Sequence, residues 1–468
     1  MSSCSGEPMP VVIRCIQILI GIVAVSRCPL IALASCLSWQ GIVHAQGGSA
    51  PAAETTAATS DTVAAPAAAP QESQNVQPQD QDCMQKIIDQ QALTRTIRAM
   101  TNPLERIPEA KYQQLRRPVA TGIQSGLAAA ADLENLTLVL KYRLFQATDP
   151  TFVANPDNVK NILNEMDREN RGAGGQAGNA QRIKEYRQKY CDAVLAVAKQ
   201  MFGNSLDARS IAIQVIKELY VNKTATGLTE NHSESLAALI GLLKDSEQPD
   251  SVKDMAAAAI GYVLSNMSVI PQQQAEVSDV IAAELDRPCT EVAYQIDLVQ
   301  TLFNITIARQ PVGPPITTAM RTFVKLVEDR KRPLQVRCHA AFGIGQGAFD
   351  NRIDFDPLAW KVANLALEAS VFFNQAPGNS AWEQCGSDLF FAHRHVDKVG
   401  LAKDPPMLPK GMMNRAAQSV PVNESGILTL KIAVALISNR TKIPQEDQVA
   451  LKAWIDANKE ALATKAWE

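Results

Sequence analysis

A short helical phrase recurs four times in this chain: Leu206-Asp207-Ala208-Arg209, Ser251-Val252-Lys253, Thr290-Glu291-Val292 and Gln335-Val336-Arg337. Aligned on Ala208, Val252, Val292 and Val336, the copies are separated by 44, 40 and 44 residues. A repeat of this length in an apolar, helical context is typical of α-solenoids. The pattern therefore predicts an all-α fold in which antiparallel helix pairs stack along the chain.

Each copy opens a helix that is apolar on one side. Val292, Ile296, Val299 and Phe303 lie at i, i+4, i+7 and i+11, which is one stripe of a helix with 3.6 residues per turn. A second apolar helix precedes three of the copies, and a short turn that begins with Asp and contains Pro joins the two. Because neither helix can bury its stripe alone, neighbouring pairs over residues 201–375 are expected to share a core.

The run Val336-Arg337-Cys338-His339-Ala340-Ala341-Phe342-Gly343-Ile344-Gly345 resembles the second helix of a HEAT repeat. Val252-Lys253 with the following Ala-rich turn is a second match and Ala208-Arg209 a third, whereas Ala293 stands where the Val292 copy should carry Lys or Arg. The resemblance covers residues 200 to 350 or so. It implies a superhelix of paired helices whose second helices line a concave surface that binds a protein or peptide.

The first 45 residues are expected to be a secretory signal peptide. Two apolar runs, 16–25 and 29–37, are separated by Arg27 and Pro29, which argues against a membrane-spanning anchor. Small residues around Ala45 predict cleavage after that position. An alternative remains open because Leu33-Ala34-Ser35-Cys36 resembles a bacterial lipobox, which would leave Cys36 lipidated and the protein anchored by lipid.

Both alternatives place the mature protein outside the cytoplasm, as a secreted or periplasmic protein of the cell envelope, with no integral membrane segment after signal removal. Residues 46–82 are rich in Ala, Pro, Thr and Gln and are expected to be a disordered linker. Residues 83–200 are predicted to be a helical N-terminal cap or degenerate repeats, 376–425 an irregular insertion and 426–468 C-terminal capping helices.

The only constellation that suggests a metal site is Cys385, His393 and His395, within the predicted insertion. A thiolate with two imidazoles could hold zinc. Two histidines one residue apart point to the same side only in an extended strand, however, and no strand pattern is evident there. Five cysteines follow the signal, an odd number without diagnostic spacing, so at least one thiol should stay unpaired within the chain. Cys338 is expected to be a small buried hydrophobic residue rather than half of a disulfide.

No phosphate loop, nucleophile elbow or His-Glu-Xaa-Xaa-His motif occurs, which favours a non-catalytic protein without cofactors. A net charge of −3 argues against a nucleic-acid partner. The one basic cluster, Arg330-Lys331-Arg332 near Arg337, is expected to complement a helix C-terminus, with an acidic partner as the alternative. The function predicted first is an exported scaffold for another protein or peptide. The alternative is a metal-binding protein or metal-dependent enzyme centred on His393.

Overall fold

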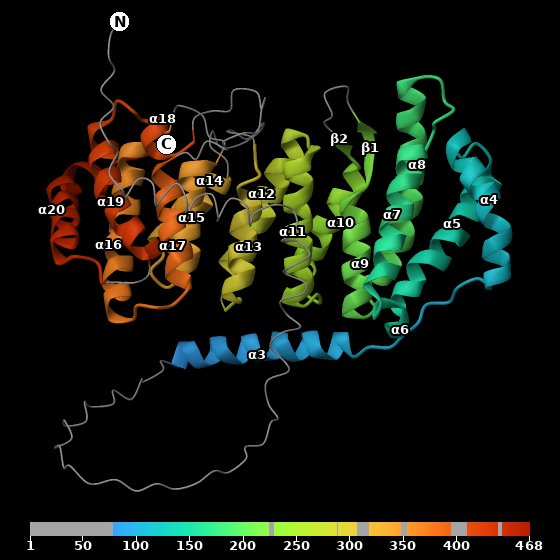
Figure 1. The fold of residues 1–468 in the computed structure, drawn as a ribbon, viewed down its shortest axis with the longest axis horizontal. Helices are drawn as coiled ribbons and strands as arrows, with labels where there is room; N and C mark the ends of the chain where they lie inside the picture. The colour runs from blue at the N-terminus through green and yellow to red at the C-terminus, as the bar shows by residue number, and fades with distance from the viewer. Residues whose placement is uncertain are drawn as a thin grey trace, which may run out of the picture. The chain divides into compact units, whose positions relative to one another are not determined.

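The apolar stripes predicted between residues 201 and 375 lie on helices that alternate between two rows (Figure 1). The computed structural model describes residues 78–223, 229–287, 289–306, 318–347, 353–394, 410–438 and 442–468. The first row contains α10 (Ser233–Lys244), α12 (Pro271–Asp286), α14 (Thr318–Glu328) and α16 (Phe355–Gln375). The second row contains α9 (Leu206–Lys217), α11 (Asp250–Asn266), α13 (Val292–Leu302), α15 (Leu334–Gln346) and α17 (Ala381–His393).

Each helix packs against its neighbours in the same row and against a helix of the other row. In the first row α10 contacts α12, α12 contacts α14 and α14 contacts α16. In the second row the contacts run from α9 through α11, α13 and α15 to α17. The prediction of a helical chain is therefore confirmed at the level of class, with eighteen α-helices in the part of the chain that the structure describes.

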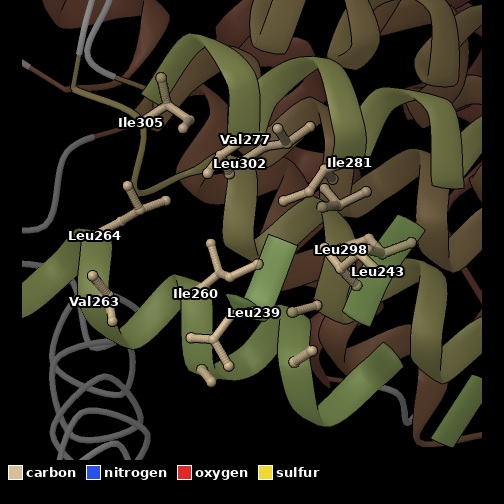
Figure 2. Close-up of a cluster of buried hydrophobic side chains, with 14 of the residues drawn as sticks. Leu239, Leu243, Ile260, Val263, Leu264, Val277, Ile281, Leu298, Leu302 and Ile305 are labelled. Atoms are coloured by element: carbon tan, nitrogen blue, oxygen red, sulfur yellow. The ribbon is translucent and has the colours of Figure 1, made fainter. Parts of the chain in front are cut away.

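The hydrophobic core lies between the rows and is shared by consecutive helix pairs. Figure 2 shows one such cluster, to which α10 contributes Leu239, α11 Ile260, α12 Ile281 and α13 Leu298. All four side chains are completely buried. Burying a side chain of this size contributes roughly 2 kcal/mol, so each pair is stabilised mainly by its neighbour.

Residues 78–201 are also helical but do not alternate in the same way. The elements are α3 (Pro78–Arg98), α4 (Glu109–Ser125), α5 (Ala130–Phe145), η1 (Gln146–Thr148), α6 (Pro150–Val153), α7 (Pro156–Gly172), α8 (Ala180–Ala198) and η2 (Lys199–Met201). A small sheet that the sequence did not predict follows α9. In it β1 (Tyr220–Lys223) pairs antiparallel with β2 (Thr229–Asn231), and β2 pairs parallel with β3 (Met267–Ser268).

Helix α3 runs across the ends of the second-row helices, as the blue helix in Figure 1 shows. A disulfide joins its Cys83 to Cys289, in the turn before α13. The Gln90 side chain accepts a hydrogen bond from the backbone N–H of Asp250, at the start of α11. Such a bond satisfies one of the four N–H groups that a helix start leaves without a partner. The predicted linker, 46–82, therefore overlaps α3 from Pro78 onward.

The predicted irregular insertion, 376–425, is wrong for its first half. Residues 381–393 form α17, which buries Cys385, Leu389 and Ala392 at helical spacing. Two more helices, α18 (Met412–Arg415) and α19 (Val420–Ser438), precede α20 (Gln445–Leu462), so α19 also begins before the predicted boundary at 426. The sequence pattern does not reveal this stripe, because His, Trp and Phe residues interrupt its apolar composition.

Glycines allow α17 to approach both neighbours closely. A Cβ atom at Gly345 of α15 would lie 2.1 Å from the carbonyl oxygen of Ala392 in α17. A Cβ atom at Gly386 of α17 would lie 2.7 Å from the carbonyl oxygen of Ala433 in α19. These helices therefore pack backbone against backbone, a contact that a larger residue would prevent.

Several predictions fall outside the described residues. They are the signal peptide of residues 1–45, its cleavage after Ala45, the lipidation of Cys36 and the linker up to residue 77. Among the described helices, α19 alone is long and apolar enough to cross a bilayer by length and composition. It packs against α16, α17 and α20 and completely buries Val422, Ile432 and Leu436.

Candidate functional site

Each second-row helix carries one stripe of side chains that the hydrophobic core does not cover. We call the combined stripes the second-helix face, and define it by residues that are exposed or half-buried: Gln214, Met255, Tyr262, Ile296, Asp297, Gln300, Phe303, Gln335, Phe342, Ser387 and Phe391. Contacts between stripes show that they adjoin. The Tyr262 hydroxyl, for example, donates a hydrogen bond of 2.9 Å to the Glu218 carboxylate, directly after α9.

Aromatic rings connect three helices of this face. The ring of Phe303 lies 4.9 Å from that of His339 and 4.8 Å from that of Phe342, and Phe342 meets Phe391 of α17 edge-on at 6.2 Å. We call Phe303, His339, Phe342 and Phe391 the aromatic ladder. Ring pairs at these distances contribute about 0.5–1.5 kcal/mol beyond their buried area. The ladder is therefore a packed row of rings that crosses three helices, with His339 buried and the three Phe rings half-buried.

His339 is the most constrained member of the ladder. Its Nδ1 lies 3.0 Å from Asp388 Oδ2 and its Nε2 lies 3.2 Å from Gln300 Oε1. Gln384 donates to the other Asp388 oxygen at 2.8 Å. Both ring nitrogens thus have a hydrogen-bond partner. The ring joins α13 to α17 and fixes the orientation of the ladder.

Two carboxyl groups meet beside the ladder, Asp254 from α11 and Asp297 from α13. They are hydrogen-bonded to one another, and burial raises the pKa of both. For Asp254 the neighbouring Asp297 charge and their hydrogen bond add to the effect of burial, and its pKa is raised to about 8. Two adjacent carboxylates cannot both ionise cheaply, so the pair retains one proton at neutral pH.

Two clefts in the described part of the chain lie away from these groups. One cleft, of about 580 Å³, lies between α10 and α12 of the first row, and another, of about 420 Å³, lies at the turns beside Arg330 and Trp382. Neither is lined by Cys385, His393 or the Asp254–Asp297 pair. The second-helix face offers instead a broad surface with apolar rings and a shared negative charge.

The predicted metal ligands are not brought together. Cys385 is disulfide-bonded to Cys338, so in this form it has no thiolate to offer, and the prediction that Cys338 would not form a disulfide is wrong. Cys385 and His393 lie on one helix, and eight residues at 1.5 Å each separate them by roughly 12 Å along its axis. That distance is too large for ligands of one zinc ion. His395 lies outside the described residues.

His393 itself is completely buried, and neither ring nitrogen has a hydrogen-bond partner among the described residues. Burial, with a smaller effect of Arg394, lowers its pKa to about 3. The imidazole is therefore neutral at physiological pH.

Of the five cysteines after the predicted signal, Cys191 alone forms no disulfide, which agrees with the expectation from their odd number. Burial raises the pKa of its thiol.

The cations of the repeated phrase link one helix pair to the next. Lys253 of α11 forms a buried ion pair of 2.9 Å with Glu284 of α12, and Arg337 of α15 pairs with Glu368 of α16 through two bonds of 2.7 and 2.9 Å. Both partners lie 31 residues further along the chain. Arg209 makes a similar buried bond of 2.6 Å to Gln248. Ala208, Val252 and Val336, one residue earlier, are completely buried, and Val292 is half-buried.

The copy that lacks this cation is connected by a different residue. Ala293 stands in place of the basic residue in this copy. The Arg332 side chain, from the turn after α14, instead donates hydrogen bonds to the Gln295 side chain and to the Leu285 carbonyl oxygen. Arg337 also donates to the carbonyl oxygen of Val327 near the end of α14, as predicted for cations near a helix C-terminus. Arg330 and Lys331 are exposed. The basic cluster is thus partly structural.

Sequence reasoning missed one group of potential metal ligands, formed by Asp192, His232 and Glu234. Asp192 lies on α8, whereas His232 and Glu234 lie at the start of α10. The spacing His-Xaa-Glu carries no specific signal, and the carboxylate lies 40 residues away from the imidazole in the chain. Only the packing of α8 against α10 brings them together.

Comparison with known proteins adds no relative: no protein-family model, no curated protein and no solved structure matches the chain.

Proposed function

We propose that this chain is an exported, non-catalytic scaffold of HEAT-like helix pairs that binds another protein, or a peptide segment of one, along the second-helix face. The aromatic ladder is the observation that carries the proposal. The row spans three helices, with His339 buried and the three Phe rings half-buried. The accessible part of those Phe rings is the apolar surface that we propose a partner covers.

The arrangement of the helices supports a HEAT-like α-solenoid. Helix pairs recur at nearly constant spacing, and two of the ion pairs between them repeat at the same separation of 31 residues. HEAT-like solenoids serve many unrelated roles, so the fold by itself does not name the partner. The partner's chemistry follows from the face. Its rings favour apolar side chains, and the charge of the Asp254–Asp297 pair favours Lys or Arg.

Export is supported by the two disulfides, because such bonds persist in oxidising compartments and are rare in the cytosol. Sequencing the N-terminus of the mature protein distinguishes cleavage after Ala45 from lipidation at Cys36. A terminus at Gln46 indicates cleavage after Ala45, and a blocked, lipid-bearing Cys36 indicates a lipoprotein. A full-length protein that stays in the cytoplasm would contradict both.

Binding is tested by photocrosslinking in intact cells. A benzophenone side chain replaces Phe342 on the second-helix face, and in a matched protein it replaces Phe372, an exposed Phe of the first row. The proposal predicts a discrete crosslinked product from the Phe342 position and none of that mass from the Phe372 position. Identical products from both positions, or none from either, would refute the face as the binding site.

A second measurement tests the partner's chemistry. Fluorescence anisotropy with the purified chain compares peptides that combine Lys or Arg with aromatic residues and the same peptides with Glu in place of the basic residues. The basic peptides should bind more tightly, and the difference should shrink as salt is raised, since salt screens exposed charges. Tighter binding of the acidic peptides would contradict the proposed face.

A further inference from the structure

Three polar side chains converge on one ring nitrogen of His232 where α8 meets the start of α10. The Nε2 atom of His232 lies 2.9 Å from Asp192 Oδ1, 3.2 Å from Glu234 Oε2 and 2.8 Å from the side-chain amide of Gln188. The His232 side chain is completely buried, whereas both carboxylates are more than half exposed. The other ring nitrogen lies 2.7 Å from Ser235 Oγ, which fixes the orientation of the ring.

The Gln188 amide also lies 3.2 Å from Asp192 Oδ1 and 3.3 Å from Glu234 Oε2, and it has only two hydrogens for the three groups around it. Nε2 can either donate one hydrogen or offer one lone pair, but three partners approach it. If Nε2 carries the hydrogen, only one of the two carboxylates receives it. If Nε2 offers its lone pair, two negative oxygens face that lone pair at close range, which is repulsive. A cation in the centre would resolve the conflict, because all three groups would then present electrons to it.

The donor set suits a borderline metal ion. One imidazole nitrogen and two carboxylate oxygens are typical ligands of zinc and manganese, and no soft sulfur ligand is present. The ligating atoms all lie within 4.8 Å of one another. Metal–ligand distances of about 2.0–2.2 Å require separations of roughly 3–4 Å, which the two exposed carboxylates can reach by rotation. Rotating the Gln188 amide would turn its oxygen toward the same centre.

We propose that Asp192, His232 and Glu234 bind one divalent metal ion of the zinc class, with Ser235 orienting the imidazole and Gln188 supporting the site. The contact of Ser235 with Nδ1 is the kind that holds a metal-bound histidine in the right tautomer. The ion would join α8 to α10. It would therefore clamp the helices of residues 83–200 onto the first helix pair of the repeat region. This role is independent of what the second-helix face binds.

Isothermal titration of the metal-free, disulfide-bonded chain with zinc chloride tests the proposal. We expect one zinc ion per chain and a rise in the thermal midpoint on binding. The variant Asp192→Asn/Glu234→Gln removes two exposed ligands without creating a cavity and should weaken binding at least tenfold. The matched control is Asp207→Asn/Glu446→Gln, two exposed carboxylates in the first turns of α9 and α20, which should bind zinc like the unaltered chain.

Anomalous scattering at the zinc edge then locates the ion in crystals, with His232 Nε2 expected at about 2.0–2.1 Å. The proposal is overturned if the unaltered chain binds no zinc, if both variants bind it equally, or if the ion lies elsewhere.

Discussion

Replacing Asp254 with Asn should change how the stability of this protein depends on pH. In the folded chain the pKa of Asp254 is raised from 3.8 to about 8. Between these values the folded state keeps a proton that the unfolded chain has released. The free energy of unfolding must therefore fall as the pH rises from about 4 to about 8, and it is independent of this group outside that window.

The size of the effect follows from the same values. At about 1.36 kcal/mol per pH unit, the interval from 3.8 to pH 7 gives a ceiling of about 4 kcal/mol. Both carboxyl groups are only partly buried by their neighbours. Water at the rim reduces the penalty, so we expect about 2 kcal/mol. In the Asp254→Asn variant the amide can donate to Asp297 at every pH, and this penalty disappears.

Urea unfolding followed by circular dichroism, at several pH values between 4 and 9, measures the difference between the two proteins. Groups common to both, including the nearby His339 and Glu291, cancel to first order. The variant should be more stable at pH 7 by about 2 kcal/mol, and the advantage should vanish near pH 4. Asp207→Asn, which alters an exposed carboxylate of α9, is the control and should show no such trend. A difference between variant and parent that stays constant across this range would refute the proton-sharing pair.

Three further predictions concern the packing of the helices. Glu284→Leu leaves buried Lys253 without its ion-pair partner and should lower the free energy of unfolding by about 3–5 kcal/mol, measured with urea. Adding Lys253→Met should recover part of that loss. No recovery would mean that the lone charge is not the cause. Gly345→Ala forces α15 away from α17 and should lower the free energy of unfolding by about 1–3 kcal/mol. The control, Gly241→Ala, adds a Cβ that meets nothing within 4 Å and should be neutral or slightly stabilising. Equal effects of the two substitutions in thermal unfolding would argue against close helix packing. Cys83→Ser should release α3, seen as faster amide hydrogen exchange in residues 83–98 than in α11; unchanged exchange there would show that the noncovalent contacts of α3 suffice.

Local sequence patterns predicted the helices well where apolar residues recur at regular spacing. The turns that begin with Asp and contain Pro correctly separated α10 from α11 and α14 from α15. The same approach missed α17, because its buried side combines Cys385 and Leu389 with aromatic and histidine neighbours. It also missed the strands beside α9, which are too short to show an alternating pattern.

The candidate sites were much harder to predict. Asp254 and Asp297 lie on separate helices, and each reads alone as an ordinary polar residue of an exposed stripe. Cys83 and Cys289 are 206 residues apart, so no spacing rule could pair them. The alternative metal site of Cys385, His393 and His395 does not assemble in its described part, because Cys385 is disulfide-bonded and α17 holds Cys385 and His393 far apart along one helix.

The sequence by itself indicated most helices of residues 201–375, because helix formation depends on contacts three and four residues apart that periodicity records directly. It also indicated that these helices come in pairs. Only the tertiary structure decided which side chains from different pairs meet, including the aromatic ladder, the shared proton of Asp254 and Asp297, and the group around His232. The physical reason is that such meetings depend on the rotation and spacing of packed helices, to which residues far apart in the chain all contribute.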